Sequence, residues 1–149
     1  MIAYTTYHTP FGAFAIGCSE TGIVSFLPSD GTCDETPTAL SRLAALQLDE
    51  YFAKKRREFT LPLDLRGTEF QIKVWRALCE IPYGETRTYG DIARAVGNGR
   101  ACRAVGMANH RNPVTIIVPC HRVVAGNGIG GYGLGTEMKR TLLMLEAGG

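Results

Sequence analysis

Residues 88–110 read TYGDIARAVGNGRACRAVGMANH. Thr88 and Asp91, three residues apart, form a capping signal for a short helix that closes at Gly97. Asn98-Gly99 then turns the chain into a second predicted helix, over 100–110. Its buried side carries small apolar residues: Ala101, Ala104, Val105 and Ala108. Two short helices joined by a tight glycine-containing turn predict a helix-turn-helix.

The chain after this pair predicts a strand, a loop and a helix. Asn112-Pro113 ends the second helix, and 115–118 (TIIV) has the composition of a short buried strand. It would deliver the run Pro119-Cys120-His121-Arg122-Val123. A loop over 126–135 holds six glycines, and a last helix follows with Leu142, Leu143 and Leu145.

The chain before the pair predicts a further helix and a separate lobe. Thr68 and Gln71 form a capping box for a helix whose apolar residues recur at helical spacing. Trp75 within it is predicted to be core. Residues 58–67 are predicted to link the lobes. Further upstream, alternation and turn residues predict three antiparallel strands over 2–7, 13–18 and 22–27, then a helix over 37–54.

These elements define an α/β (α+β) fold with two parts. Residues 1–66 are predicted to form an N-terminal lobe, a small three-stranded antiparallel sheet plus a helix, with its linker. Residues 67–149 are predicted to form a helical, winged-helix-like lobe that carries Cys120. The helical face expected to pack on the sheet comprises Leu40, Leu43, Ala44, Leu48, Tyr51 and Phe52.

Charge is unevenly distributed along the chain. The net charge is +2, yet residues 87–122 hold six arginines against Asp91 alone. Arginine suits planar and phosphate recognition better than lysine does. A solvated basic face is the commoner explanation of such a cluster, so only its position within a motif can assign it to DNA.

The cysteines predict free thiols. Five cysteines at irregular spacing, with no CxxC pair, make a poor disulfide framework. The three scattered histidines do not suggest a zinc site. No apolar run approaches the roughly 20 residues of a membrane helix, and the start lacks the pattern of a signal peptide. These features predict a cytoplasmic protein that binds neither metal nor membrane.

Cys120 is the candidate nucleophile. Thiolate is the reactive form, and a neighbouring imidazole or cation lowers its pKa. On a strand, Cys120 and His121 would point to opposite faces, so their contact would need a kink at Pro119 or a bridging water. An inert core cysteine is the alternative, and Cys120 taken alone favours it.

Two further features have equally plain alternatives. The slim helix 100–110 carries Arg103 among small residues, which fits either entry into a DNA groove or tight core packing. The glycine-rich loop with Tyr132 fits a lid over a flat substrate or a simple hairpin wing. It lacks the pattern of a nucleotide-binding loop.

In combination, these motifs resemble the O6-alkylguanine-DNA alkyltransferase family. The matching segments are FQxxVW (70–75), IPYGE (81–85), TYxxIA (88–93), RAVG (103–106), NP (112–113), IVPCHRV (117–123) and KxxLLxxE (139–146). The close resemblance covers about 68–147, while residues 1–66 match only in order and size.

The resemblance implies the chemistry of the site. Cys120 would accept the alkyl group irreversibly. His121, through a water, and Glu146 would deprotonate it, and Lys139 would support the site. Tyr89 would donate a hydrogen bond to guanine N3. No cofactor is implied.

The resemblance also implies how the lesion is reached. Arg103 would fill the base stack after the lesion flips out, and Asn112 would tie the cysteine turn to the recognition helix. The slim DNA-facing surface would comprise Ala101, Cys102, Gly106 and Arg100, together with Tyr89. The pocket would be lined by Tyr132, Gly133, Val123 and Thr115. Backbone carbonyls of Cys120 and Val123 would read the guanine amine.

The implied partner is double-stranded DNA containing O6-alkylguanine, bound through the minor groove by a monomer with little sequence preference. O4-alkylthymine is a second implied substrate. Thr115 and Gly133 stand where members often carry Pro and Ser, which leaves the range of alkyl groups open. Two other interpretations remain: a helix-turn-helix lesion sensor or regulator without chemistry, and a Cys-His thiol hydrolase, which lacks an evident oxyanion hole.

Overall fold

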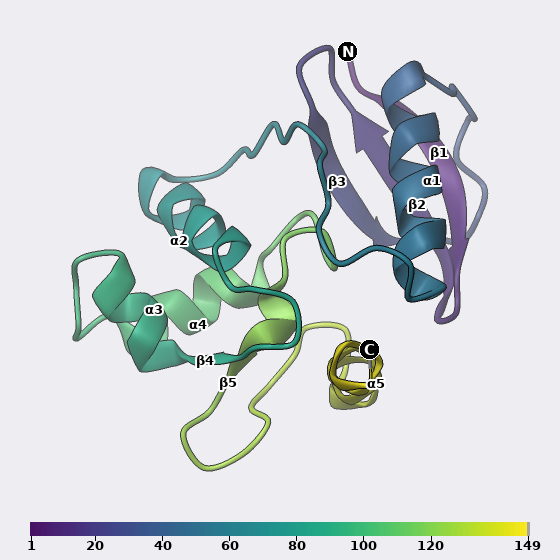
Figure 1. Ribbon diagram of the computed structural model, residues 1–149. Coiled ribbons are helices and arrows are strands. Elements are labelled where there is room, and N and C mark those ends of the chain that lie inside the picture. The colour runs from purple at the N-terminus through teal and green to yellow at the C-terminus, as the bar shows by residue number, and fades with distance from the viewer. Residues whose placement is uncertain (149) are drawn as a thin grey trace. The chain divides into compact units, whose positions relative to one another are not determined.

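In a computed structural model that describes residues 1–148, the chain forms two compact units (Figure 1). The first comprises Met1–Arg66 together with Pro113–Thr115, and the second comprises Gly67–Asn112 and the chain from Ile116 on. A short return segment, Pro113–Thr115, therefore leaves the second unit to join the first.

The N-terminal unit is a three-stranded antiparallel meander with one helix, as predicted. Its strands are β1 (Ala3–Thr9), β2 (Gly12–Cys18) and β3 (Ile23–Pro28), in the order β1-β2-β3. Helix α1 (Ala39–Phe52) lies along the sheet (Figure 1). The core of this unit is apolar and aromatic: Phe14, Ile16, Ile23, Phe26, Ala44, Leu48 and Tyr51.

The buried face of α1 differs in part from its prediction. Ala44, Leu48 and Tyr51 are buried as expected, but Leu43 is 41% exposed. Ser41 and Gln47 are buried instead. Both are polar, and both are satisfied: Ser41 completes a capping box with Thr38, and Gln47 exchanges two hydrogen bonds with Thr60. Hydrophobicity alone missed them because a paired polar group can be buried at little cost.

The outer edge of β3 is covered by two separate segments. Ile23 pairs in parallel with Leu63, and Phe26 pairs in parallel with Val114 of the return segment. Gly22 is needed for the first contact, because an added Cβ would lie 2.8 Å from the Asp64 nitrogen. Covering the edge protects the sheet from pairing with other chains.

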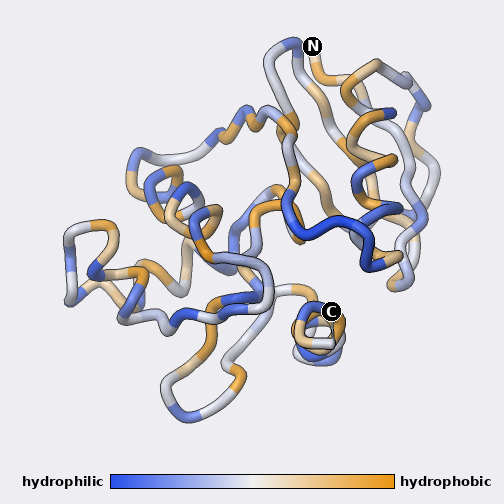
Figure 2. The backbone as a smooth tube through the Cα atoms, in the orientation of Figure 1, coloured by the Kyte–Doolittle hydropathy of each residue, from blue (hydrophilic) through white to orange (hydrophobic). Residues whose placement is uncertain are grey.

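A hydrophilic run, residues 54–57, comes directly after the end of α1 (Figure 2).

The second unit is built mainly from helices. They are α2 (Glu69–Cys79), α3 (Tyr89–Ala95), α4 (Cys102–His110) and α5 (Thr136–Ala147). The predicted capping boxes at Thr68 and Thr88 are both present. Gly97, with φ of +84°, turns the chain between α3 and α4. The predicted helix pair is therefore confirmed.

The chain between α4 and the cysteine corrects one prediction. Residues 115–118 are buried but form a turn instead of a strand, and Ile116 has φ of +71°. An apolar run shows that a segment is buried, but not which backbone it adopts. Cys120 consequently begins a one-turn 3-10 helix, η1 (Cys120–Arg122). The short parallel pair of β4 (Arg87–Thr88) and β5 (Val123–Val124) was not predicted, because two residues carry no periodicity.

Trp75 is core, as expected, and it also joins two helices. Its side chain is 2% exposed, and its Nε1 donates to the Ala108 carbonyl of α4 at 2.8 Å. The indole therefore fixes α2 against α4 both by packing and by a buried hydrogen bond.

We expect Trp75→Phe to lower the free energy of unfolding by about 1–3 kcal/mol, because it removes the buried indole hydrogen bond to Ala108 and replaces the indole with a smaller aromatic ring. Urea unfolding provides the measurement. Tyr7→Phe is the matched control: it removes a 2.7 Å hydrogen bond to Asp49 at an exposed position and should cost less. Equal losses in the two variants would contradict the role given to the indole N–H.

Candidate active site

Two asparagines of the second unit hold the turn that carries Cys120. Asn112, just after α4, donates from Nδ2 to the Val118 carbonyl at 2.8 Å. Asn109, in the last turn of α4, donates from Nδ2 to the Cys120 carbonyl at 3.2 Å. Cys120 is 3% exposed. The end of α4 therefore fixes the position of the cysteine, through the predicted Asn112 and through Asn109, which sequence reasoning missed.

Opposing effects act on the pKa of the Cys120 thiol. Burial raises its pKa, whereas the side chains of Asn112 and Tyr132 and the charge of Lys139 lower it. The net direction is upward. The resting thiol is therefore protonated at neutral pH, and its use as a nucleophile requires a base.

His121, which follows Cys120 in the chain, is paired with Glu146 and is in a form that can act as a base. His121 is fully buried, and its Nε2 lies 2.7 Å from Glu146 Oε2. Burial lowers the pKa of His121, although Glu146 opposes the shift, so the ring is neutral at pH 7. With Nε2–H donating to the carboxylate, Nδ1 carries the lone pair. Nδ1 is buried without a hydrogen-bond partner and can accept a proton.

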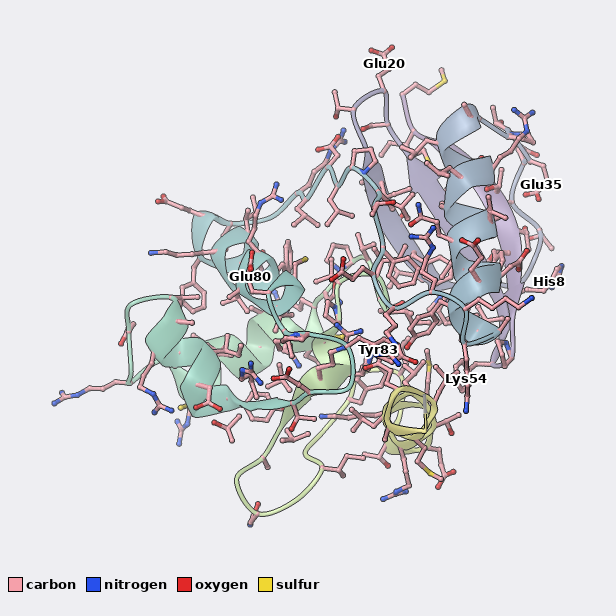
Figure 3. All side chains as sticks on the ribbon, in the orientation of Figure 1. His8, Glu20, Glu35, Lys54, Glu80 and Tyr83 are labelled. Carbon is pink, nitrogen blue, oxygen red and sulfur yellow. The ribbon has the colours of Figure 1, made fainter. Side chains whose placement is uncertain are left out.

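Arg122 completes this network, whereas the sequence indicated only that it lies near Cys120 and within the basic window. Its Nε and Nη2 donate to the Glu146 carboxylate at 2.8 and 3.1 Å, and its Nη1 donates to the Ile81 carbonyl at 2.7 Å. Its guanidinium also lies 5.7 Å from the ring centroid of Tyr83 (labelled in Figure 3). Arg122 therefore neutralises a buried carboxylate that also orients His121.

The burial of Arg122 also corrects the interpretation of the basic window. Arg122 cannot contact phosphate, and Arg87 and Arg94 pair with Glu85 and Asp91. Arg100, Arg103 and Arg111 are exposed and lie outside the ion pairs found among residues 87–122. The DNA-facing charge is smaller than the formal count of the window.

Lys139 supports the same turn from α5. It is fully buried, and its Nζ donates to the carbonyls of Val123 at 2.5 Å and Gly131 at 3.0 Å. Burial lowers its pKa to about 8, so Lys139 is still mainly charged at pH 7. It joins the cysteine turn to the glycine-rich loop.

A cavity of about 310 Å³ lies between α4 and the glycine-rich loop. It is lined by Tyr89, Gly106, Asn109, His110, Gly131, Tyr132 and Gly133. Its volume is at the lower end of small-molecule sites, which suits a ligand the size of one base. Burial raises the pKa of Tyr89, so its hydroxyl stays protonated and can donate a hydrogen bond.

The remaining predicted residues occupy three places. Val123 is fully buried in β5 beside the cysteine turn. The outer surface at the start of α4 holds Arg100, Ala101, Cys102 and Arg103. Thr115 instead belongs to the N-terminal unit, where its hydroxyl donates to the Phe26 carbonyl at 2.7 Å.

No cluster of three or more His, Cys, Asp or Glu side chains among residues 1–148 could hold a metal ion. No helix in the same range is long and apolar enough to cross a membrane.

The fold and the site define a class of protein in which a DNA-binding helical unit carries a buried, base-assisted cysteine. Residues 69–148 match the family described as 6-O-methylguanine DNA methyltransferase, DNA binding domain. Residues 2–65 match the ribonuclease-like domain of the same proteins. The chain therefore belongs to the 6-O-methylguanine DNA methyltransferase family.

Methyltransferases of this family resemble the chain in both sequence and structure. The methylated-DNA–protein-cysteine methyltransferase of Methanosarcina acetivorans is 45% identical over 151 residues, which span 96% of this chain and 97% of the relative. That of Mycolicibacterium paratuberculosis is 46% identical, with 98% and 93% covered. The crystal structure of Mycobacterium tuberculosis OGT in complex with DNA has a TM-score of 0.90 and 45% identity, with 98% and 93% covered. The predicted fold class is confirmed.

We expect Arg122→Met to lower the free energy of unfolding by about 3–5 kcal/mol, because it leaves the buried Glu146 carboxylate without its cation. Urea unfolding at pH 7 provides the measurement. Arg140→Met is the control, since Arg140 makes an exposed pair with Glu137 and its loss should have little effect. Adding Glu146→Gln to Arg122→Met should recover part of the stability. No recovery would contradict the electrostatic explanation.

Proposed function

We propose that this chain repairs DNA by transferring an alkyl group from the O6 atom of guanine to Sγ of Cys120. The observation that carries the proposal is the pairing of His121 with Glu146 directly beside the buried Cys120. Such a base is needed to ionise a thiol, and a protein that only binds DNA has no use for it. The named methyltransferase relatives support the same reaction.

The proposed reaction is a direct displacement. His121 Nδ1 takes the Cys120 proton through a water, while the Glu146 carboxylate stabilises the resulting imidazolium. The thiolate then attacks the alkyl carbon in line, forming the S–C bond as the C–O6 bond breaks. The bonding electrons pass to the purine. The Tyr89 hydroxyl donates toward N3 of the departing base and stabilises this charge.

The product explains why the protein acts once. A thioether has no good leaving group, and nothing in the proposed site activates water against it. The DNA supplies the alkyl group and the protein supplies the acceptor sulfur, so the proposed reaction requires no cofactor. Each molecule would therefore repair one lesion.

A base inside a duplex cannot reach a buried thiol, so we propose that the lesion flips into the cavity beside α4. Arg103, exposed in the first turn of α4, would occupy the vacated stack. The slim surface formed by Ala101, Cys102 and Gly106 would allow a close approach through the minor groove, and Arg100 would contact the backbone. O4-alkylthymine is a further proposed substrate.

The proposed setting follows from the same chemistry. A reactive thiol must stay reduced, and Cys18, Cys33, Cys79, Cys102 and Cys120 are all free. We therefore place the protein in the cytoplasm. We propose that it acts as a monomer on double-stranded DNA with little sequence preference.

We expect the intact mass of the protein to rise by one methyl group in place of one proton after incubation with DNA containing O6-methylguanine. Cys120→Ala should bind the DNA but show no mass change, because the acceptor sulfur is gone. Cys79→Ala, which removes an exposed thiol at the end of α2, is the matched control and should react fully. Methyl transfer by Cys120→Ala would refute the assignment. DNA binding by the native chain without any mass change would favour the lesion sensor.

We expect the single-turnover rate with free O6-benzylguanine to follow a bell-shaped pH profile. Below pH 6.5 the rate should rise with pH as His121 loses its proton, and above about pH 8 it should fall as Lys139 loses the charge that favours the thiolate. Lys139→Met should react more slowly at pH 7 and lack the alkaline fall. Arg140→Met, on the exposed side of α5, should keep the native profile. An alkaline fall retained in Lys139→Met would exclude Lys139 as its source.

A further inference from the structure

The rim of the 310 Å³ cavity contains one side chain that can carry a positive charge. Three of the residues that line the cavity are exposed and therefore form its rim: His110, Gly131 and Gly133. The other titratable lining residues are Tyr89 and Tyr132, and burial raises the pKa of both hydroxyls, so both are neutral. Among the lining residues, His110 alone can therefore become a cation.

The imidazole of His110 lies against the glycine-rich loop. His110 is the last residue of α4, and a Cβ added to Gly133 would come within 3.3 Å of its carbonyl oxygen and 3.5 Å of its Nδ1. The first distance is tight for a Cβ contact. Glycine at position 133, where the family resemblance implied that Ser is frequent, thus gives His110 room to lie beside the loop at the cavity rim.

No carboxylate neutralises His110. Among residues 1–148, none of the ion pairs includes it. The loop and α3 face it with the two neutral tyrosines, and Asp91, the acidic residue of α3, pairs with Arg94. Lys139, which holds the loop from α5, donates to two backbone carbonyls. A proton gained by His110 would therefore add a charge that no acidic side chain pairs with.

A flipped nucleotide brings phosphates to this rim. Rotation about the backbone carries the base into the cavity, whereas the flanking phosphates remain part of the strand outside it. Phosphate oxygens accept hydrogen bonds and attract cationic side chains. On α4, His110 lies seven positions after Arg103, which is two helical turns along the same face, and exposed Arg111 follows it. His110 thus extends a positively charged surface to the cavity rim.

We propose that His110 binds a backbone phosphate beside the flipped nucleotide, and that protonation of its imidazole strengthens this contact. The inference rests on the proposed function and adds a DNA contact outside the base pocket. Imidazole is the side chain whose charge ordinarily changes between about pH 5 and 8. A neutral ring can donate one hydrogen bond to phosphate, and the protonated ring also attracts its charge and releases a counterion. Affinity for DNA therefore rises as the pH falls through this range.

The test measures the salt dependence of binding to a duplex that contains O6-methylguanine. Cys120→Ala serves as the background, because it is expected to bind this DNA without reacting. The logarithm of Kd is plotted against the logarithm of the salt concentration at about pH 5.5 and about pH 7.5. One ionic phosphate contact changes the slope by about 0.9, so raising salt from about 50 to about 200 mM should weaken binding roughly threefold more at the lower pH.

Two substitutions of His110 separate its charge from its packing. His110→Gln keeps a hydrogen-bonding side chain without a charge and should show the shallow slope at both pH values. His110→Arg is charged throughout and should show the steep slope at both. A slope that still depends on pH in His110→Gln would overturn the inference, and so would a shallow slope in His110→Arg. Because His110 is exposed, both variants are expected to fold, and a melting curve of each checks this.

His8→Gln is the matched control. His8 lies in β1 of the N-terminal unit, where its charge acts on Glu35 (both labelled in Figure 3), and its replacement should leave the pH dependence of the slope native. Loss of the pH dependence in this control would also overturn the inference. The third histidine, His121, is fully buried and pairs with Glu146, so it contributes no phosphate contact. Absence of methyl transfer by the native chain would refute the proposed function, whereas the binding slopes test His110 separately.

Discussion

The buried carboxylate of Glu146 is the constraint on which the site depends. A carboxylate that is 1% exposed is tolerated only when its charge is compensated and its oxygens are hydrogen-bonded. Arg122 compensates the charge of Glu146 and donates two hydrogen bonds to its carboxylate, and His121 makes a further hydrogen bond with it. Because Arg122 also donates to the Ile81 carbonyl after α2, a single ion pair ties together α5, η1 and the end of α2.

Burial also affects the protonation of Cys120 and His121. Enclosing a thiol suppresses its ionisation, and the pKa of Cys120 is indeed raised by its burial. Enclosing an imidazole keeps it neutral, and this neutral form is the one that can accept a proton. Burial therefore favours the uncharged form of both groups. In the proposed reaction, Glu146 would stabilise the imidazolium that forms when His121 accepts the proton, in a medium where this charge is otherwise costly.

The cysteine turn shows how a strained backbone can be maintained. Ile116 is β-branched and has a positive φ, which is unfavourable for such a residue. Asn112 and Asn109 hold the segment that follows, and the return segment 113–115 pairs with β3 of the N-terminal unit. Residues 113–115 belong to the N-terminal unit, although the residues on both sides of them belong to the second unit. Their hydrogen bonds are made with partners distant in sequence.

Local patterns were enough to predict the meander, the capped helices α2 and α3 and the helix pair, because turn residues and capping boxes act over three or four positions. They could not predict that residues 115–118 turn, that Arg122 is buried, or that Asn109 faces the cavity. Each of these depends on a partner far along the chain: Phe26 for Thr115, Glu146 for Arg122 and the Cys120 carbonyl for Asn109. Periodicity reports whether a residue is buried, but the pairing of buried polar groups is decided only when distant segments meet.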